Sequence, residues 1–276
     1  MKKFNFRTTF FSLLVFCISL TILSCSDDTV SMETEISSST LEKLAAAHFD
    51  ISKARATVFM GEYGIAVEDM FFTLEQIDEL QGSDGIHSKQ YRTNNLVKKL
   101  PRVITVSVDP DLGQLGSDAL DNMIAMYNNE NLELAFQRVA FGGKGKRKAN
   151  IEVTEFYEQE SGGFITLGRA AGFPTRKGDP AKGFGINSRW FELLNPSLAE
   201  VAGTMAHEVG HCIGFRHTDY MTRESCGSNV NEGSAGVGAI HISGTPLGSD
   251  ASSLMQSCGP ADSFNNNDRI ALNQLY

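Results

Sequence analysis

The spacing of hydrophobic residues predicts a helix between strands in the middle of the chain. Residues 102–108 alternate in the period of two that is typical of a strand. Residues 117–129 repeat hydrophobic positions every three or four residues and predict a helix, with Ser117 as a candidate N-cap. Further apolar segments predict four strands, over residues 134–140, 149–156, 164–171 and 183–187. The predicted order is therefore strand, helix and four strands.

A longer helix is predicted after these strands. It starts at Asn195, or at Ser197, which forms a capping box with Glu200. It continues to about Ile213, and Gly214 follows at the position where a left-handed residue often ends a helix. A last helix is predicted over residues 268–275.

Hydrophobic patterns before residue 96 predict a small lobe. A helix over residues 41–49 and short strands over 56–59 and 64–67 follow from their hydrophobic patterns. A capping box begins a short helix over residues 73–80, and a turn follows at residues 82–85. We therefore expect two units, a small N-terminal lobe over residues 41–95 and a larger domain over residues 101–276.

The first residues are typical of a targeting segment. Three basic residues precede an apolar run over residues 10–23, which is short for a membrane span. The run ends in Ile-Leu-Ser before Cys25, which resembles a bacterial lipoprotein signal; the alternative is a plain secretory signal with an incidental Cys25. We expect a signal peptide over residues 1–24 and a polar tether over residues 25–40. The protein would then be exported and lipid-anchored through Cys25 at the outer membrane or surface of a Gram-negative bacterium, or released.

Composition excludes one class of function. The chain has 276 residues, 41% of them hydrophobic, which is ordinary for a globular protein. Its net charge is -9, the opposite sign to that of most nucleic-acid binders. We therefore expect no nucleic-acid partner, no membrane contact beyond the lipid anchor, and a monomer.

Residues 207–217 read His-Glu-Val-Gly-His-Cys-Ile-Gly-Phe-Arg-His and carry the candidate chemistry. His207 and His211 are four positions apart on the predicted helix, so their rings stack on one face and can reach one metal ion. Gly214 allows a sharp turn that brings His217 back as a third ligand. Three histidines leave the fourth zinc position open, which is typical of a catalytic site.

Glu208 is a candidate general base. It lies about 100° around the helix from His207, so it is badly placed as a ligand but can reach a metal-bound water. We expect one zinc ion that activates water for attack on a carbonyl. The alternatives are a core helix with incidental histidines, or another divalent ion in the same site.

The segment 204–219 resembles the metzincin metallopeptidases, and within them the bacterial dual-action HEIGH family, with Val209 in place of Ile. The resemblance covers about residues 101–276. It implies an α+β fold with a mixed, mostly parallel sheet, an active-site helix and an irregular C-terminal subdomain. It also implies a methionine turn at Met255, which would form an apolar floor, and a substrate that pairs with an exposed sheet edge near residues 167–171.

Asp219 and the cysteines near the motif are further candidates for a role in the site. Asp219 is a candidate acceptor for the free N–H of a metal-binding histidine, or it helps the loop to turn. The chain has five cysteines. Cys212 falls on the core side of the helix and predicts a buried thiol, which leaves Cys226 and Cys258 as the candidate disulfide.

The sequence leaves two functions open. The first is a zinc endopeptidase acting on proteins or peptides outside the cytoplasm. The second is a surface lipoprotein with a binding or adhesion role and an inactive zinc site, in which Glu208 would be free to change; the presence of Glu208 favours the enzyme. The lobe is either a prosegment or a retained module. It contains no cysteine, so a latch on the metal would need an acid, Glu68 or Asp69.

Overall fold

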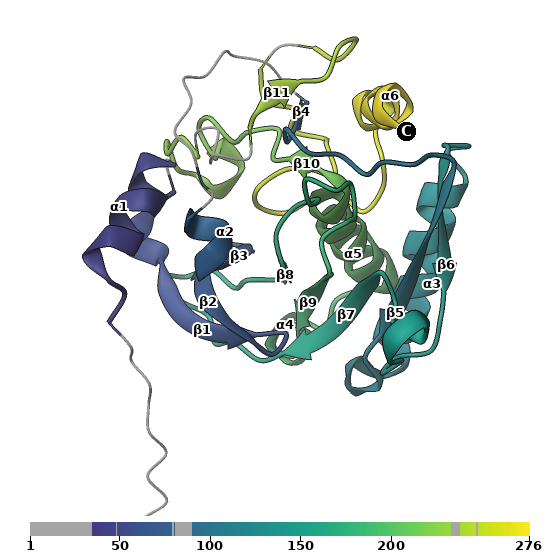
Figure 1. The fold of residues 1–276 in the computed structure, drawn as a ribbon, viewed down its shortest axis with the longest axis horizontal. Coiled ribbons are helices and arrows are strands. Elements are labelled where there is room, and N and C mark those ends of the chain that lie inside the picture. The colour runs from purple at the N-terminus through teal and green to yellow at the C-terminus, as the bar shows by residue number, and fades with distance from the viewer. Residues whose placement is uncertain (1–34, 48, 79, 81–89, 233–237, 247) are drawn as a thin grey trace, which may run out of the picture. The chain divides into compact units, whose positions relative to one another are not determined.

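A mixed sheet of eight strands runs through the part of the chain that the computed structural model describes, residues 35–276 without 48, 79, 81–89, 233–237 and 247 (Figure 1). Its strands are β1 (Arg55–Phe59), β2 (Glu62–Val67), β3 (Met70–Thr73), β5 (Arg102–Val108), β6 (Leu134–Arg138), β7 (Ile151–Phe156), β8 (Gly168–Ala170) and β9 (Gly183–Asn187). They lie in the order β1-β2-β3-β8-β9-β7-β5-β6. Parallel pairs join β6, β5, β7 and β9, and also β3 and β8, while β8–β9 and the β1–β2–β3 meander are antiparallel.

Helices and a second, smaller sheet complete the fold. The helices are α1 (Ser38–Ala46), α2 (Leu74–Asp78), α3 (Gly113–Asn128), α4 (Ser188–Leu194), α5 (Leu198–Ile213) and α6 (Asn266–Leu275). The smaller sheet has the order β10-β4-β11, with bounds β4 (Tyr91–Arg92), β10 (Phe215–Arg216) and β11 (Ile240–His241). Few regular elements follow α5, so the predicted α+β fold with a mostly parallel sheet and an irregular C-terminal part is confirmed.

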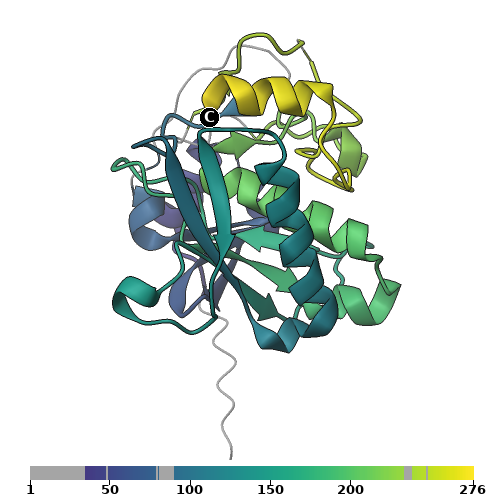
Figure 2. The same cartoon turned by 90° about the vertical axis from the view of Figure 1, so that its right-hand side faces the viewer.

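The main core lies between the sheet and the helices α3 and α5, which pack side by side (Figure 2). Leu120 and Met123 of α3 are fully buried, and so are Met205 and Val209 of α5. This packing fixes α5, because burial of one apolar stripe contributes more to helix stability than intrinsic propensity does. Ser197 and Glu200 form the predicted capping box at the start of α5.

The predicted order of strand, helix and four strands is confirmed as β5, α3 and β6–β9. Helix α3 begins at Gly113 and not at the predicted Ser117, because a 3₁₀ turn over Pro110–Leu112, capped by Asp109, leads directly into it. The elements that were not predicted include β3, α4 and the two-residue strands β4 and β10. The short apolar run of β3 has no alternation that would mark it as a strand.

The N-terminal elements continue the sheet of the larger unit. Strand β3 pairs with β8, with Met70 opposite Ala170. Ala170 and Phe173 share a buried cluster with residues of α1, β2, β3 and α2. Strands from both sides of the predicted boundary near residue 95 thus pair in one sheet. The edge expected to be exposed on β8 is covered by β3, which corrects that expectation.

The predicted signal peptide, the lipidation candidate Cys25 and most of the tether lie outside the described residues. Within the described ranges, the helices are too short or too polar to cross a bilayer.

The packing of α3 predicts an unequal effect of one substitution at two sites. Leu120 is fully buried in the main core, whereas Leu194 in α4 is 59% exposed. We expect Leu120→Ala to lower the free energy of unfolding by about 2–5 kcal/mol and Leu194→Ala by less than about 0.5 kcal/mol. Urea denaturation followed by circular dichroism measures both. Equal losses would mean that α3 does not carry the core.

Candidate metal centre

Helix α5 presents the first two histidines of the predicted motif on one face. The Nε2 atoms of His207 and His211 lie 3.1 Å apart. The Nδ1–H of His207 donates to the carbonyl oxygen of Leu254 at 2.8 Å, and that of His211 donates to Phe215 O at 2.9 Å. Since a carbonyl oxygen can only accept, each Nδ1 carries the proton and each Nε2 lone pair points inward.

Gly214 returns the chain to this face. Its φ is 117°, and a Cβ atom there would lie 2.8 Å from Leu96 Cδ2 and 3.1 Å from Asn95 O. Glycine therefore satisfies both the left-handed backbone and the close approach. Three residues later, His217 places its Nε2 atom 3.1 Å from that of His211. The structure thus brings together the three histidines that the sequence predicts as ligands.

Asp69 adds a fourth donor. It lies between β2 and β3, and its Oδ2 atom is 2.7 Å from Nε2 of His217, 3.6 Å from Nε2 of His207 and 3.7 Å from Nε2 of His211. One ligand atom from each of these four residues lies within 4.8 Å of all the others. A tetrahedral zinc ion with bonds of 2.0–2.1 Å separates its ligands by about 3.3 Å, so the cluster fits such an ion.

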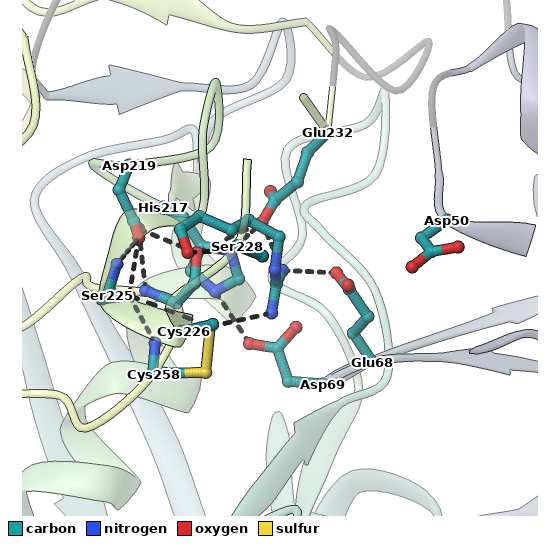
Figure 3. The surroundings of a disulfide bond; sticks show 12 residues. Asp50, Glu68, Asp69, His217, Asp219, Ser225, Cys226, Ser228, Glu232 and Cys258 are labelled. Carbon is teal, nitrogen blue, oxygen red and sulfur yellow. Dashed lines mark hydrogen bonds and ion pairs between the residues drawn. A yellow bond between two sulfur atoms is a disulfide. The ribbon is translucent and has the colours of Figure 1, made fainter. Parts of the chain in front are cut away.

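His217 is oriented by a carboxylate that the sequence analysis missed. Its Nδ1–H donates to Oε1 of Glu232 at 2.8 Å, and Glu232 also accepts from Arg223 and from Arg216. Arg223 in turn donates to Glu68, which neighbours Asp69. Figure 3 shows Glu232 and Asp69 on opposite sides of the His217 ring. Glu232 follows a loop without a recognisable motif, so no local signal in the sequence marks it.

Burial and charge set the protonation of the cluster. Burial lowers the pKa of His211 to about 4, which keeps the ring neutral and able to bind a metal. Burial also disfavours a charged His217, but Asp69 and Glu232 outweigh it and hold its pKa well above the ordinary value. For Glu208, burial and the Asp69 charge raise the pKa well above the usual range.

Glu208 lies beside the histidines and next to strand β8. It is 2% exposed, and its Oε2 atom has no hydrogen-bond partner among the described residues. A Cβ atom at Gly168 in β8 would lie only 2.4 Å from Oε1 of Glu208. The strand can therefore pass close to the carboxylate only because residue 168 is a glycine.

Met255, the residue expected in a methionine turn, lies against helix α5 at Gly210. It is 4% exposed, and its Sδ atom would be 2.5 Å from a Cβ atom at Gly210. The preceding residue, Leu254, supplies the carbonyl oxygen that orients His207. Packing of this turn under α5 is thus coupled to the position of one histidine.

Asp219 organises the loops below the cluster. It accepts hydrogen bonds from the backbone N–H and hydroxyl groups of both Ser225 and Ser257. These bonds fit its predicted role in the loop turn, and the histidine N–H groups have the other acceptors described above. The adjacent residues Cys226 and Cys258 form the predicted disulfide (Figure 3), and Cys212 is a free, buried thiol.

The contact between Gly210 and Met255 gives a prediction. We expect Gly210→Ala to destabilise the protein by about 1–3 kcal/mol through overpacking, although alanine favours a helix by about 1 kcal/mol over glycine. In a double-mutant cycle with Met255→Ala, the clash disappears and a coupling of about 0.5–3 kcal/mol should appear in denaturation experiments. Additive effects would contradict the contact.

The hydrogen bond from His217 to Glu232 gives a second prediction for this site. We expect Glu232→Gln to weaken zinc binding about 10–100-fold, because the neutral amide holds the ring less firmly. Competition with a chromophoric chelator measures the dissociation constant, and thermal melting of the metal-free protein checks the fold. The exposed Glu224 provides the matched control, Glu224→Gln, which should bind zinc like the wild type. Unchanged binding in Glu232→Gln would remove this role.

Comparison with solved structures finds several proteases. Two structures of myroilysin are similar with TM-scores of 0.43 and 0.42 and 13% and 14% identity, covering 67% and 66% of this chain and 98% and 86% of theirs. High choriolytic enzyme 1, a hatching enzyme zinc-protease from the medaka fish Oryzias latipes, has a TM-score of 0.37 and 13% identity, covering 63% of this chain and 88% of its own. No curated protein sequence matches the chain.

The sequence model of the dual-action HEIGH metallo-peptidases matches residues 65–276. The match includes the three histidines, Glu208, Glu232 and Asp69. It confirms the resemblance that residues 204–219 suggest. Because it covers most of the chain, this protein belongs to the dual-action HEIGH metallopeptidase family.

Proposed function

We propose that the protein is a zinc-dependent endopeptidase with one catalytic zinc ion, held by His207, His211 and His217. The observation that carries this proposal is the convergence of three buried Nε2 atoms beside a buried carboxylate. Imidazole nitrogens are donors that zinc prefers, and each ring is oriented by an acceptor on its other nitrogen. The metallopeptidase family of the chain supports the same assignment.

A zinc ion bound there would polarise the substrate carbonyl and lower the pKa of the attacking water. Glu208 then acts as the general base: it takes a proton from the water and delivers it to the leaving amine. Its burial supports this role, because a carboxylate in a site of low dielectric has a raised pKa and is a stronger base.

Strand β8 supports cleavage within a chain rather than at its end. It passes directly beside Glu208, as the contact with Gly168 shows. A peptide that took the place of β3 beside β8 would extend in both directions from the reacting carbonyl. Backbone hydrogen bonds to a sheet edge hold many sequences, so we propose proteins or extended peptides as substrates.

We also propose that the protein acts outside the cytoplasm, anchored by lipid at Cys25. The apolar run before Cys25 supports export. The disulfide between Cys226 and Cys258 supports an oxidising compartment, where such bonds persist.

Replacement of the base tests the reaction. We expect wild-type protein to cleave peptides of a mixed library, with loss of activity on addition of a chelator. Glu208→Ala should reduce the amount of peptide cleaved after a fixed time about a hundredfold or more. The variant should still bind one zinc ion per chain, because Glu208 is not a ligand. Mass spectrometry of the digest and metal analysis measure the two quantities. Equal cleavage by both proteins would refute the mechanism. Cleavage only at the ends of the peptides would refute the endopeptidase assignment.

A further inference from the structure

The fourth donor of the metal cluster comes from the N-terminal part of the chain. The Asp69 carboxylate lies where a three-histidine site of a hydrolase binds water, within 2.7–3.7 Å of all three Nε2 atoms. A zinc ion with four protein ligands is closed, whereas catalysis needs an open position. The described arrangement therefore opposes the chemistry that the histidines and Glu208 serve.

Strand β3, which follows Asp69, opposes substrate binding independently. The backbone N–H of Ala170 donates to the carbonyl oxygen of Asp69 at 2.8 Å, and Met70 is paired with Ala170. The other edge of β8 pairs with β9. At Ala170 both edges of β8 are thus occupied, so a peptide could not pair along the whole of β8 while β3 is in place.

From these two obstructions we propose that residues 35–73 form an autoinhibitory segment, which keeps the enzyme latent with Asp69 on the metal and β3 on the substrate edge. The proposal rests on the proposed function, because only a catalytic metal site has an activity to suppress. Release of the segment would open the fourth metal position and the edge of β8 together.

Arg223 links the segment to the metal site. It is buried and donates both to Glu68, which precedes Asp69, and to Glu232, which orients His217. An ion pair in such surroundings is screened far less by solvent than one on the surface. Arg223 therefore holds the turn between β2 and β3 in the register that aims Asp69 at the cluster.

The other contacts between residues 35–73 and the rest of the protein are few enough for the segment to separate. Its ladder with β8 consists of a single residue pair. Three other ion pairs, Lys43–Asp78, Arg55–Glu158 and Glu62–Lys182, involve partly exposed side chains, and such pairs contribute little to stability. Its apolar contacts lie within the segment and with α2, Ala170, Ala171 and Phe173, in clusters separate from the main core. Departure would thus leave the main core between α3, α5 and the sheet unchanged.

Access to the metal tests the proposal without any catalysis. The full chain is loaded with Co²⁺, whose visible spectrum reports its ligands, and titrated with acetohydroxamate, a small chelator that needs an open metal position. We expect Asp69→Ala to bind acetohydroxamate about tenfold or more tightly than the wild type, because the competing carboxylate is removed. Asp111→Ala, which removes an exposed acid outside the segment and the metal cluster, should match the wild type. Asp69→Asn, of the same shape, replaces Asp69→Ala if that variant does not fold.

Initial rates of cleavage of a quenched fluorescent peptide complete the test. Mass spectrometry of each enzyme checks that its own chain is still intact during the measurement. We expect Asp69→Ala to start about tenfold or more faster than intact wild type. Loss of cobalt from both Asp69 variants, or unchanged hydroxamate affinity, would show that Asp69 is a lasting ligand or a bystander and would overturn the proposal. Equal initial rates would overturn latency but leave the peptidase intact. Tighter hydroxamate binding without cleavage by any variant would instead refute the proposed function and support Asp69 as the residue that closes the metal.

Discussion

At Gly214 the chain leaves helix α5 with a φ of 117° and turns back toward the face that it has just formed. A helix alone offers only two histidines to one ion, so the third must come from a chain that reverses within three residues. The reversal leaves no room for a side chain at residue 214, which touches Leu96 and Asn95. The rest of the site depends on this constraint, because His217 is also the histidine that contacts Asp69 and Glu232.

The three rings are oriented from three separate parts of the chain. His211 uses Phe215, directly after the reversal, whereas His207 uses Leu254 and His217 uses Glu232. The irregular C-terminal part therefore supports the candidate metal ligands. The bond between Cys226 and Cys258, with the hydrogen bonds of Asp219 beside it, fixes the loops that carry these acceptors. Few regular elements are needed, because side chains and backbone carbonyls replace a hydrogen-bonded ladder.

Sequence reasoning found the parts of the site that depend on local chemistry. The spacing of His207 and His211, the capping box at Ser197 and the stop at Gly214 act over a few residues, and the structure contains all three. It did not find Glu232, because the position of a loop acid depends on tertiary packing. It named Asp69 only as one of two acids for a latch, because β3 has no period that predicts a strand and its partner β8 lies about a hundred residues away. Register between distant strands is not encoded in local pattern.

The disulfide joins two cysteines that both lie after α5, and the other cysteine among the described residues is a free thiol. In the ranges that the structure covers, no sulfur bridge therefore ties residues 35–73 to the remainder. While the backbone is intact, the segment meets its binding site at an effective concentration set by the connecting chain, which is in the millimolar range for short flexible links. One break in that connection would turn the contact into an ordinary association between two molecules, and dilution alone would then separate them.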